Sequence, residues 1–154
     1  MRTGVRIAVD VGSVRVGVAR SDASGTLAVP VTTLARGKGD LPAIAALVAE
    51  HEALEVIVGL PLTLDNRYGA AAEHALAYAK ALAAVVGSTP IVMVDERLTT
   101  AAAQRGLHDA GRTTKSSRSV IDQAAAVELL QGALEAEQRT GRSSGTPLEG
   151  VVDE

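Results

Sequence analysis

Two short β-branched runs separated by a tight turn open the chain and constrain its fold most strongly. Hydrophobic residues alternate with polar or small ones over residues 5–9 and again over residues 14–18, which is the period of a half-buried strand. Gly12 and Ser13 lie between the runs, so the segment predicts an antiparallel hairpin. The carboxylate of Asp10 is expected beside that turn. Gly17 removes a side chain within the second strand, which indicates that another segment packs closely there.

The next segments predict an α/β fold with a mixed sheet. Residues 27–34 predict a third strand, which Pro30 places at an edge of the sheet because proline cannot donate to a β-ladder. Asp40 is expected to cap a helix, and a short apolar strand follows at residues 55–58. A second helix, over roughly residues 68–86, leads to another strand at residues 91–94.

Strands joined through helices pair in parallel, and ligands collect at the carboxyl ends of such strands. We therefore expect Asp10, Gly59 and the pair Asp95-Glu96 to lie at one edge of the sheet. A further helix is predicted to start at Thr99 or Thr100.

The C-terminal third predicts one more helix and a tail. Residues 112–118 lack apolar residues and predict an exposed basic loop, either a solvated connection or a phosphate contact. The last helix is expected to begin at Ser119. The chain from Arg139 onward is rich in Gly and Ser without periodicity. We therefore assign residues 1–138 to one domain and residues 139–154 to a disordered tail.

Composition excludes several functional classes. The chain has 154 residues, 47% of them hydrophobic, but no Phe or Trp and only two Tyr, which argues against single-strand binding by aromatic stacking. There is no Cys, no signal-peptide pattern and no apolar stretch near the ~18 residues of a membrane span, so we expect a cytoplasmic protein without membrane contact. The net charge of −3 gives no indication of nucleic-acid binding by itself.

Acids at three places in this topology can converge on one point. Asp10 follows the first strand, Asp95 and Glu96 follow the last parallel strand, and Asp122 lies near the start of the last helix. Crowded carboxylates raise one another's pKa unless a cation is present. Mg²⁺ prefers oxygen ligands, and two such ions about 4 Å apart can promote phosphodiester hydrolysis. For Asp122 a helix-capping role is the alternative, since S-x-x-D is also a capping pattern.

Four motifs stand out in order and spacing: D-V-G-S-V-R-V-G-V-A at residues 10–19, V-G-L-P-L at 58–62, D-E-R-L-T-T at 95–100 and I-D-Q-A-A-A-V-E-L-L-Q at 121–131. Together they resemble the YqgF/RuvX family, a branch of the ribonuclease H-like superfamily, and the resemblance covers roughly residues 5–134. The resemblance implies a ribonuclease H-like fold with a five-stranded sheet in the order 3-2-1-4-5, flanked by helices. It also implies that Asp10, Glu96 and Asp122 are the catalytic, metal-binding acids, with Asp95 the less favoured choice beside Glu96.

The same resemblance implies a nuclease, a hydrolase that acts on ester bonds with Mg²⁺ or Mn²⁺. The favoured role is 5′-end processing of pre-16S rRNA in ribosome biogenesis. A Holliday junction resolvase and a non-catalytic nucleic-acid-binding module are the alternatives. D-x-G after a strand also resembles the phosphate loop of actin-like ATPases, but 154 residues leave no room for their two domains.

Expected partners are nucleic acid, either pre-rRNA or branched DNA, and the assembling small ribosomal subunit. A junction resolvase requires two active sites, and the sequence shows no dimer seam, so we expect a monomer or a weak homodimer. Basic residues near the predicted acids are the expected substrate contacts: Arg15, Arg97, Arg112, Lys115 and Arg118.

Overall fold

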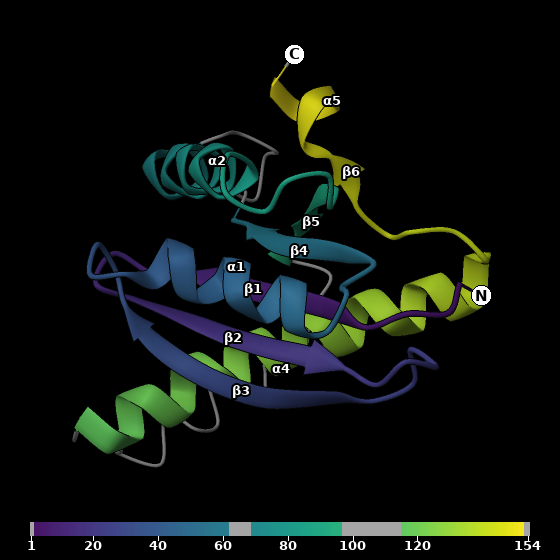
Figure 1. Cartoon of the computed structure of the whole chain (residues 1–154), viewed down its shortest axis with the longest axis horizontal. Coiled ribbons are helices and arrows are strands. Elements are labelled where there is room, and N and C mark those ends of the chain that lie inside the picture. The colour runs from purple at the N-terminus through teal and green to yellow at the C-terminus, as the bar shows by residue number, and fades with distance from the viewer. Residues whose placement is uncertain (1, 62–68, 97–114, 153–154) are drawn as a thin grey trace.

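The computed structural model describes residues 2–61, 69–96 and 115–152, which form one mixed sheet with helices on both faces (Figure 1). The sheet order is β3-β2-β1-β4-β5-β6. The strands are β1 (Arg6–Val11), β2 (Arg15–Ser21), β3 (Ala28–Ala35), β4 (Glu55–Leu60), β5 (Ile91–Asp95) and β6 (Thr146–Pro147). The described helices are α1 (Asp40–Glu50), α2 (Ala70–Ala83), α4 (Lys115–Thr140) and α5 (Leu148–Val152).

The two faces of the sheet are packed differently. Val, Ile and Leu side chains, such as Ile7 and Val9 of β1, form the core beneath α1 and α2. On the opposite face small residues, including Ala8 and Ala19, lie beneath leucines of α4. Because successive side chains of a strand point to opposite faces, each strand of this sheet supplies both layers. The small residues let α4 pack close to β1, β2 and β3.

The structure confirms the predicted hairpin and strand order. β1 and β2 pair antiparallel with Asp10 opposite Gly17, and the amide of Gly12 closes the turn by donating to the carbonyl of Arg15 at 2.9 Å. β4 is parallel to both β1 and β5, and β3 lies at the edge. The predicted order 3-2-1-4-5 is thus confirmed, and β6 adds a sixth strand beyond β5.

The C-terminal segment is ordered, so the prediction of a disordered tail is wrong for its described part. β6 pairs antiparallel with β5 through Val92 opposite Pro147. Leu148 and Val151 of α5 are buried in the core beneath α2. A two-residue strand and a five-residue helix are too short to produce a hydrophobic period, which is why the sequence pattern did not reveal them.

Helix α4 also begins earlier than predicted. It starts at Lys115 rather than Ser119, so the described end of the predicted basic loop is helical. Asp122 consequently lies about two turns inside the helix, where it cannot cap the amino end. The capping interpretation of Asp122 is therefore wrong. The helix expected after Thr100 lies outside the described residues.

Asp40 also has a different role from the one predicted. The residue that precedes helix α1 is Gly39, and no side chain caps this helix. The buried carboxylate of Asp40 instead accepts hydrogen bonds from the Gly37 amide at 2.8 Å and from the Tyr78 hydroxyl at 2.5 Å. Asp40 therefore joins the loop after β3 to helix α2.

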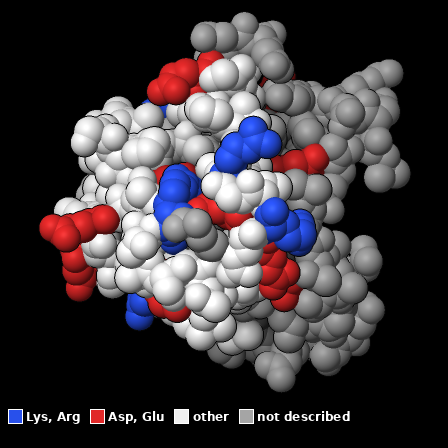
Figure 2. Space-filling model, turned by 90° about the vertical axis from the view of Figure 1, so that its right-hand side faces the viewer, with Lys and Arg blue, Asp and Glu red and all other residues white. Residues whose placement is uncertain are grey.

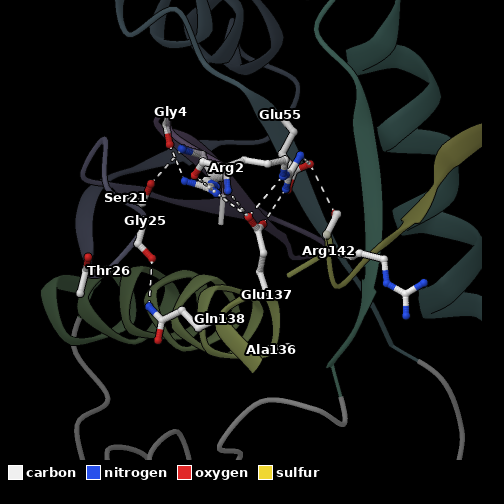
Figure 3. Close-up of polar contacts among 12 residues, drawn as sticks. Arg2, Gly4, Ser21, Gly25, Thr26, Glu55, Ala136, Glu137, Gln138 and Arg142 are labelled. Carbon is white, nitrogen blue, oxygen red and sulfur yellow. Dashed lines mark hydrogen bonds and ion pairs between the residues drawn. The ribbon is translucent and has the colours of Figure 1, made fainter. Parts of the chain in front are cut away.

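A buried ion network, defined here as Arg2, Arg6, Glu55 and Glu137, closes the end of the sheet where β1 and β4 begin. Figure 2 views this end and shows basic and acidic side chains interleaved at its centre. Arg2 forms a two-pronged pair with Glu55, both bonds at 3.1 Å, and also binds Glu137 at 2.6 Å (Figure 3). Arg6 donates to Glu137 at 2.8 Å. The network ties the N-terminus, β4 and the end of α4 together.

None of the helices in the described segments is long and apolar enough to cross a membrane.

Candidate active site

Asp10 is the second-last residue of β1 and lies next to the turn that joins β1 to β2. Ala8, two residues earlier, packs beneath α4. Since residues i and i+2 of a strand share a face, Asp10 projects toward the α4 side of the sheet. It does so at the carboxyl end of the parallel strand β1, the location predicted for the site.

Glu96 directly follows β5, and Gly59 of β4 provides the space for it. A Cβ atom on Gly59 would lie only 2.5 Å from Oε1 of Glu96, so any larger residue there would displace this carboxyl. The Glu96 and Asp10 side chains are joined by a hydrogen bond. Two acids 86 positions apart in the sequence, on strands separated by β4, are thereby brought into contact.

The surroundings of Asp10 and Glu96 disfavour the state in which both carboxyl groups are ionised. Burial raises the pKa of Asp10, the hydrogen bond from Glu96 lowers it, and the charge of Asp122 raises it; the net change is upward. Burial, the hydrogen bond to Asp10 and the charges of Asp10 and Asp95 raise the pKa of Glu96 to about 8. At neutral pH Glu96 therefore keeps its proton and donates it to Asp10.

Asp122 reaches the same region from α4. Its backbone carbonyl lies directly over Gly17, where a Cβ would collide with it, which explains the glycine within β2. Its side chain accepts a hydrogen bond at 2.7 Å from Nε of Arg15. Arg15 is the first residue of β2, so the arginine of the opening motif pairs with the aspartate of the last one.

The structure brings together part of the predicted site. Asp10 and Glu96 are in contact, and Asp122 is near enough for its charge to act on Asp10. Among the residues described, no three His, Cys, Asp or Glu side chains lie together as a ready-made metal site. Arg15 engages the carboxylate of Asp122 instead. Asp95 acts on Glu96 through its charge.

Several predicted substrate contacts cannot be placed. Arg97 and Arg112 lie outside the described residues, and only the backbone of Lys115 and Arg118 is described, in the first turn of α4. Sequence reasoning located Gly59 near the site but missed its role as the space for Glu96. It also missed the pairing of Arg15 with Asp122, for which the only available signal was that both lie in motifs of one family.

The fold and this acidic strand-end site define a class of protein, the ribonuclease H-like nucleases. A solved structure with this fold is "T. thermophilus RuvC in complex with Holliday junction substrate", with a TM-score of 0.57, 14% identity, and coverage of 92% of this chain and 99% of that one. The family model RuvX, described as Holliday junction resolvase, matches residues 4–136. The chain belongs to the RuvX family, and its members are hydrolases that act on ester bonds.

Curated relatives match almost the whole chain. A protein of Thermobifida fusca (strain YX) named "Putative pre-16S rRNA nuclease" is 54% identical, with coverage of 98% of this chain and 99% of the relative. A protein of the same name from Nocardioides sp. (strain ATCC BAA-499 / JS614) is 51% identical, covering 97% and 99%.

Proposed function

We propose that this chain is a divalent-metal-dependent nuclease that hydrolyses phosphodiester bonds near the 5′ end of pre-16S rRNA, with Asp10, Glu96 and Asp122 as its metal-binding acids. The observation that carries the proposal is the half-buried, hydrogen-bonded carboxyl pair of Asp10 and Glu96 at the strand-end edge. Carboxyl groups with strongly shifted pKa values gather at functional sites, because catalysis and ligand binding depend on burial and neighbouring charges that shift these pKa values.

The chemistry of these side chains fits a hard cation. The donors are all carboxylate oxygens, the ligand type that Mg²⁺ and Mn²⁺ prefer. Without a cation the pair of Asp10 and Glu96 keeps a proton, and the charge of Asp122 disfavours ionisation of Asp10 further. When bound, such ions supply water activation and stabilisation of the leaving oxygen.

The residues of the chain have separate tasks in this proposal. Glu96 would release its proton to solvent, so that both carboxylates of the pair could hold a cation. Asp122 would hold the same cation, and the guanidinium of Arg15, now paired with Asp122, would lie beside the site for a substrate phosphate. Arg97, Arg112, Lys115 and Arg118 remain proposed contacts to the substrate backbone, and Asp95 remains the less favoured metal ligand.

Pre-16S rRNA is the favoured substrate because relatives at about half identity over nearly the full chain carry that name. An assembling small ribosomal subunit would then present the RNA. Cleavage of a Holliday junction is the second candidate, favoured by the description of the family model. It requires two symmetrically placed active sites and therefore a dimer.

One experiment separates these substrates. Purified protein, with Mg²⁺ or Mn²⁺, is given a pre-16S leader RNA and a synthetic four-way DNA junction, with Asp10→Asn protein as the control. We expect metal-dependent cleavage of the RNA that the control lacks. Paired symmetrical nicks in the junction with intact RNA would replace this proposal by the resolvase, and cleavage of neither substrate would favour a binding module.

A further inference from the structure

We propose that a cavity beside the active-site turn, on the face of the sheet opposite Asp10, binds a backbone phosphate of the substrate through Arg36. This inference rests on the proposed function, since it names a subsite for the nucleic acid that the acids cleave. The cavity has a volume of about 250 Å³. Its described lining is Val11, Gly12, Ser13, Arg36, Ala70, Ala71 and His74.

Arg36 is held in place by contacts that use one of its guanidinium nitrogens among the described residues. Its Nη1 donates to the carbonyl of Gly12 at 3.0 Å, and its guanidinium lies over the ring of Tyr78, 5.3 Å from the centroid. None of the ion pairs in the described part of the chain includes Arg36. A guanidinium has five N–H donors in a planar fork, which matches two oxygens of a phosphate.

Two buried side chains, Tyr78 and Asp40, hold the segment around Arg36 in place. Tyr78, one of two aromatic residues in the chain, is buried and donates its hydroxyl to Asp40 at 2.5 Å. Asp40 in turn accepts from the amide of Gly37, the residue after Arg36. A cation fixed over a buried ring loses little side-chain entropy when it binds a ligand, so the arrangement favours binding.

The remaining walls leave room for an anion. Ala70 and Ala71 present only methyl groups, Ser13 offers a hydroxyl donor, and His74 lies about one turn further along α2. None of the described residues that line the cavity is acidic. The lining of the cavity therefore suits the anionic phosphate of a phosphodiester.

The cavity lies at the same end of the sheet as the acids, so the phosphate it binds belongs to the strand that is cleaved. Val11 packs with the core under α1 and α2, whereas Asp10 projects to the α4 side. The cavity and the acids thus lie on opposite faces at the same end of β1, and Arg36 binds the turn two residues from Asp10. A strand that crosses this end of the sheet would place one phosphate at the acids and another at Arg36.

The test is a salt titration of RNA binding, measured in EDTA by fluorescence anisotropy with a labelled single-stranded pre-16S leader RNA. One phosphate contact contributes about −0.7 to the slope of log affinity against log salt concentration. We expect Arg36→Gln to flatten the slope by about 0.7 and to weaken binding about tenfold at low salt. A scrambled RNA should show the same loss, because a phosphate contact carries no sequence information.

Two matched variants make the result specific. Ala71→Leu fills the cavity without changing charge at an exposed helix position, and should flatten the slope like Arg36→Gln. Arg142→Gln removes the same charge at the other end of the molecule, where its side chain points away from the ion network (Figure 3), and should leave the slope unchanged. Thermal melts by circular dichroism check that each variant is folded.

The outcomes decide the inference separately from the proposed function. An unchanged slope in Arg36→Gln, or an equal loss in Arg142→Gln, overturns it. A loss in Arg36→Gln but not in Ala71→Leu places the phosphate outside the cavity and overturns the site as well. Cleavage of RNA by the wild-type protein in Mg²⁺, measured in parallel, reports on the proposed function alone.

Discussion

Each end of the sheet holds a pair of acidic side chains, buried at one end and half-buried at the other, and the two pairs have different neighbours. Where β1 and β4 begin, Glu55 and Glu137 are 3% and 2% exposed, and arginines face them. Burial raises the pKa of Glu137, but the hydrogen bond from Arg2 and the charge of Arg6 outweigh it, so that the net pKa is lowered. At the other end the pKa values of Asp10 and Glu96 are raised, and among the described residues the charges of Asp122 and Asp95 contribute to the rise.

The comparison shows that burial alone does not indicate function. A buried carboxylate paired with arginine is a structural element whose charges are satisfied within the chain. A half-buried carboxyl pair whose pKa values are raised by burial and by neighbouring acids instead fits the metal site that we propose. In this proposal one end of the molecule stabilises the fold and the other binds a ligand.

Removal of the central acid should give the largest effect on function. Asp10→Asn should lower the rate of RNA cleavage in Mg²⁺ by at least about a thousandfold, because several kcal/mol of charge stabilisation are lost. The same variant should melt at a higher temperature than the wild-type protein without metal, since a crowded buried charge is gone. Glu135→Gln, at an exposed position of α4, is the control and should cleave normally. Normal cleavage by Asp10→Asn would show that this end is not catalytic.

Disruption of the ion network, at the end of the sheet where β1 and β4 begin, should instead lower the free energy of unfolding. Arg6 is fully buried, and Arg6→Met leaves Glu137 short of one cation, which should cost about 3 kcal/mol of unfolding free energy. Urea denaturation measures this loss. The double variant Arg6→Met/Glu137→Leu should recover part of it, because no unpaired charge remains. If the single and double variants were equally unstable, the ion pair would not be the cause.

Removal of the C-terminal segment should also destabilise this fold. Truncation after Gly141 deletes β6 and α5 and exposes the core around Leu148 and Val151, so we expect a loss of about 3 kcal/mol. Leu148→Ala alone should account for a large part, and Glu149→Ala, at an exposed position of α5, should have no measurable effect. A truncated protein with the wild-type melting temperature would restore the interpretation of residues 139–154 as a dispensable tail.

The smallest expected effect is a pH dependence of stability, which should have opposite signs for the acids at the two ends of the sheet. Because the pKa of Glu96 is about 8 in the folded protein and near 4.5 when unfolded, the metal-free fold binds the extra proton between these values. Its stability should fall as pH rises from 5 to 9. Glu96→Gln should remove that slope and gain about 2 kcal/mol at pH 9.

Glu137→Gln is the opposite case, measured by the same melts. The lowered pKa of Glu137 contributes stability above its unfolded pKa, which is lost as pH falls through the folded value. Glu137→Gln should therefore be less stable than the wild-type protein at neutral pH. If both substitutions changed stability in the same direction, the contrast between the ends would be wrong.

The local pattern of the sequence predicted most of the sheet. Alternation in residues 5–18 and the position of Pro30 predicted the antiparallel strands, and the resemblance predicted their order, which the structure confirms. Gly17 was correctly interpreted as a close approach, although only the structure identifies the Asp122 carbonyl as the group above it. These features depend on residues that are neighbours in sequence or in one motif.

The features that sequence analysis missed depend on contacts between distant segments. Arg2 and Glu137 are 135 positions apart, and nothing in either neighbourhood predicts their pairing. Glu55 appeared only as the polar start of an apolar strand. The contacts among Arg36, Tyr78 and Asp40 join a loop, the interior of one helix and the start of another. A single tyrosine forms no periodic pattern from which its partners could be predicted.

The most direct test of the account is calorimetric titration of the wild-type protein with Mn²⁺ at pH 7, in two buffers of different ionisation enthalpy. A cation that displaces the shared proton of Asp10 and Glu96 should release close to one proton per protein, because the pKa of Glu96 is about 8 before binding. Glu96→Gln should bind more weakly and release none, while Glu135→Gln should behave as the wild-type protein. Binding without proton release, or equal binding by Glu96→Gln, would contradict the claim that this carboxyl pair is completed by a metal ion.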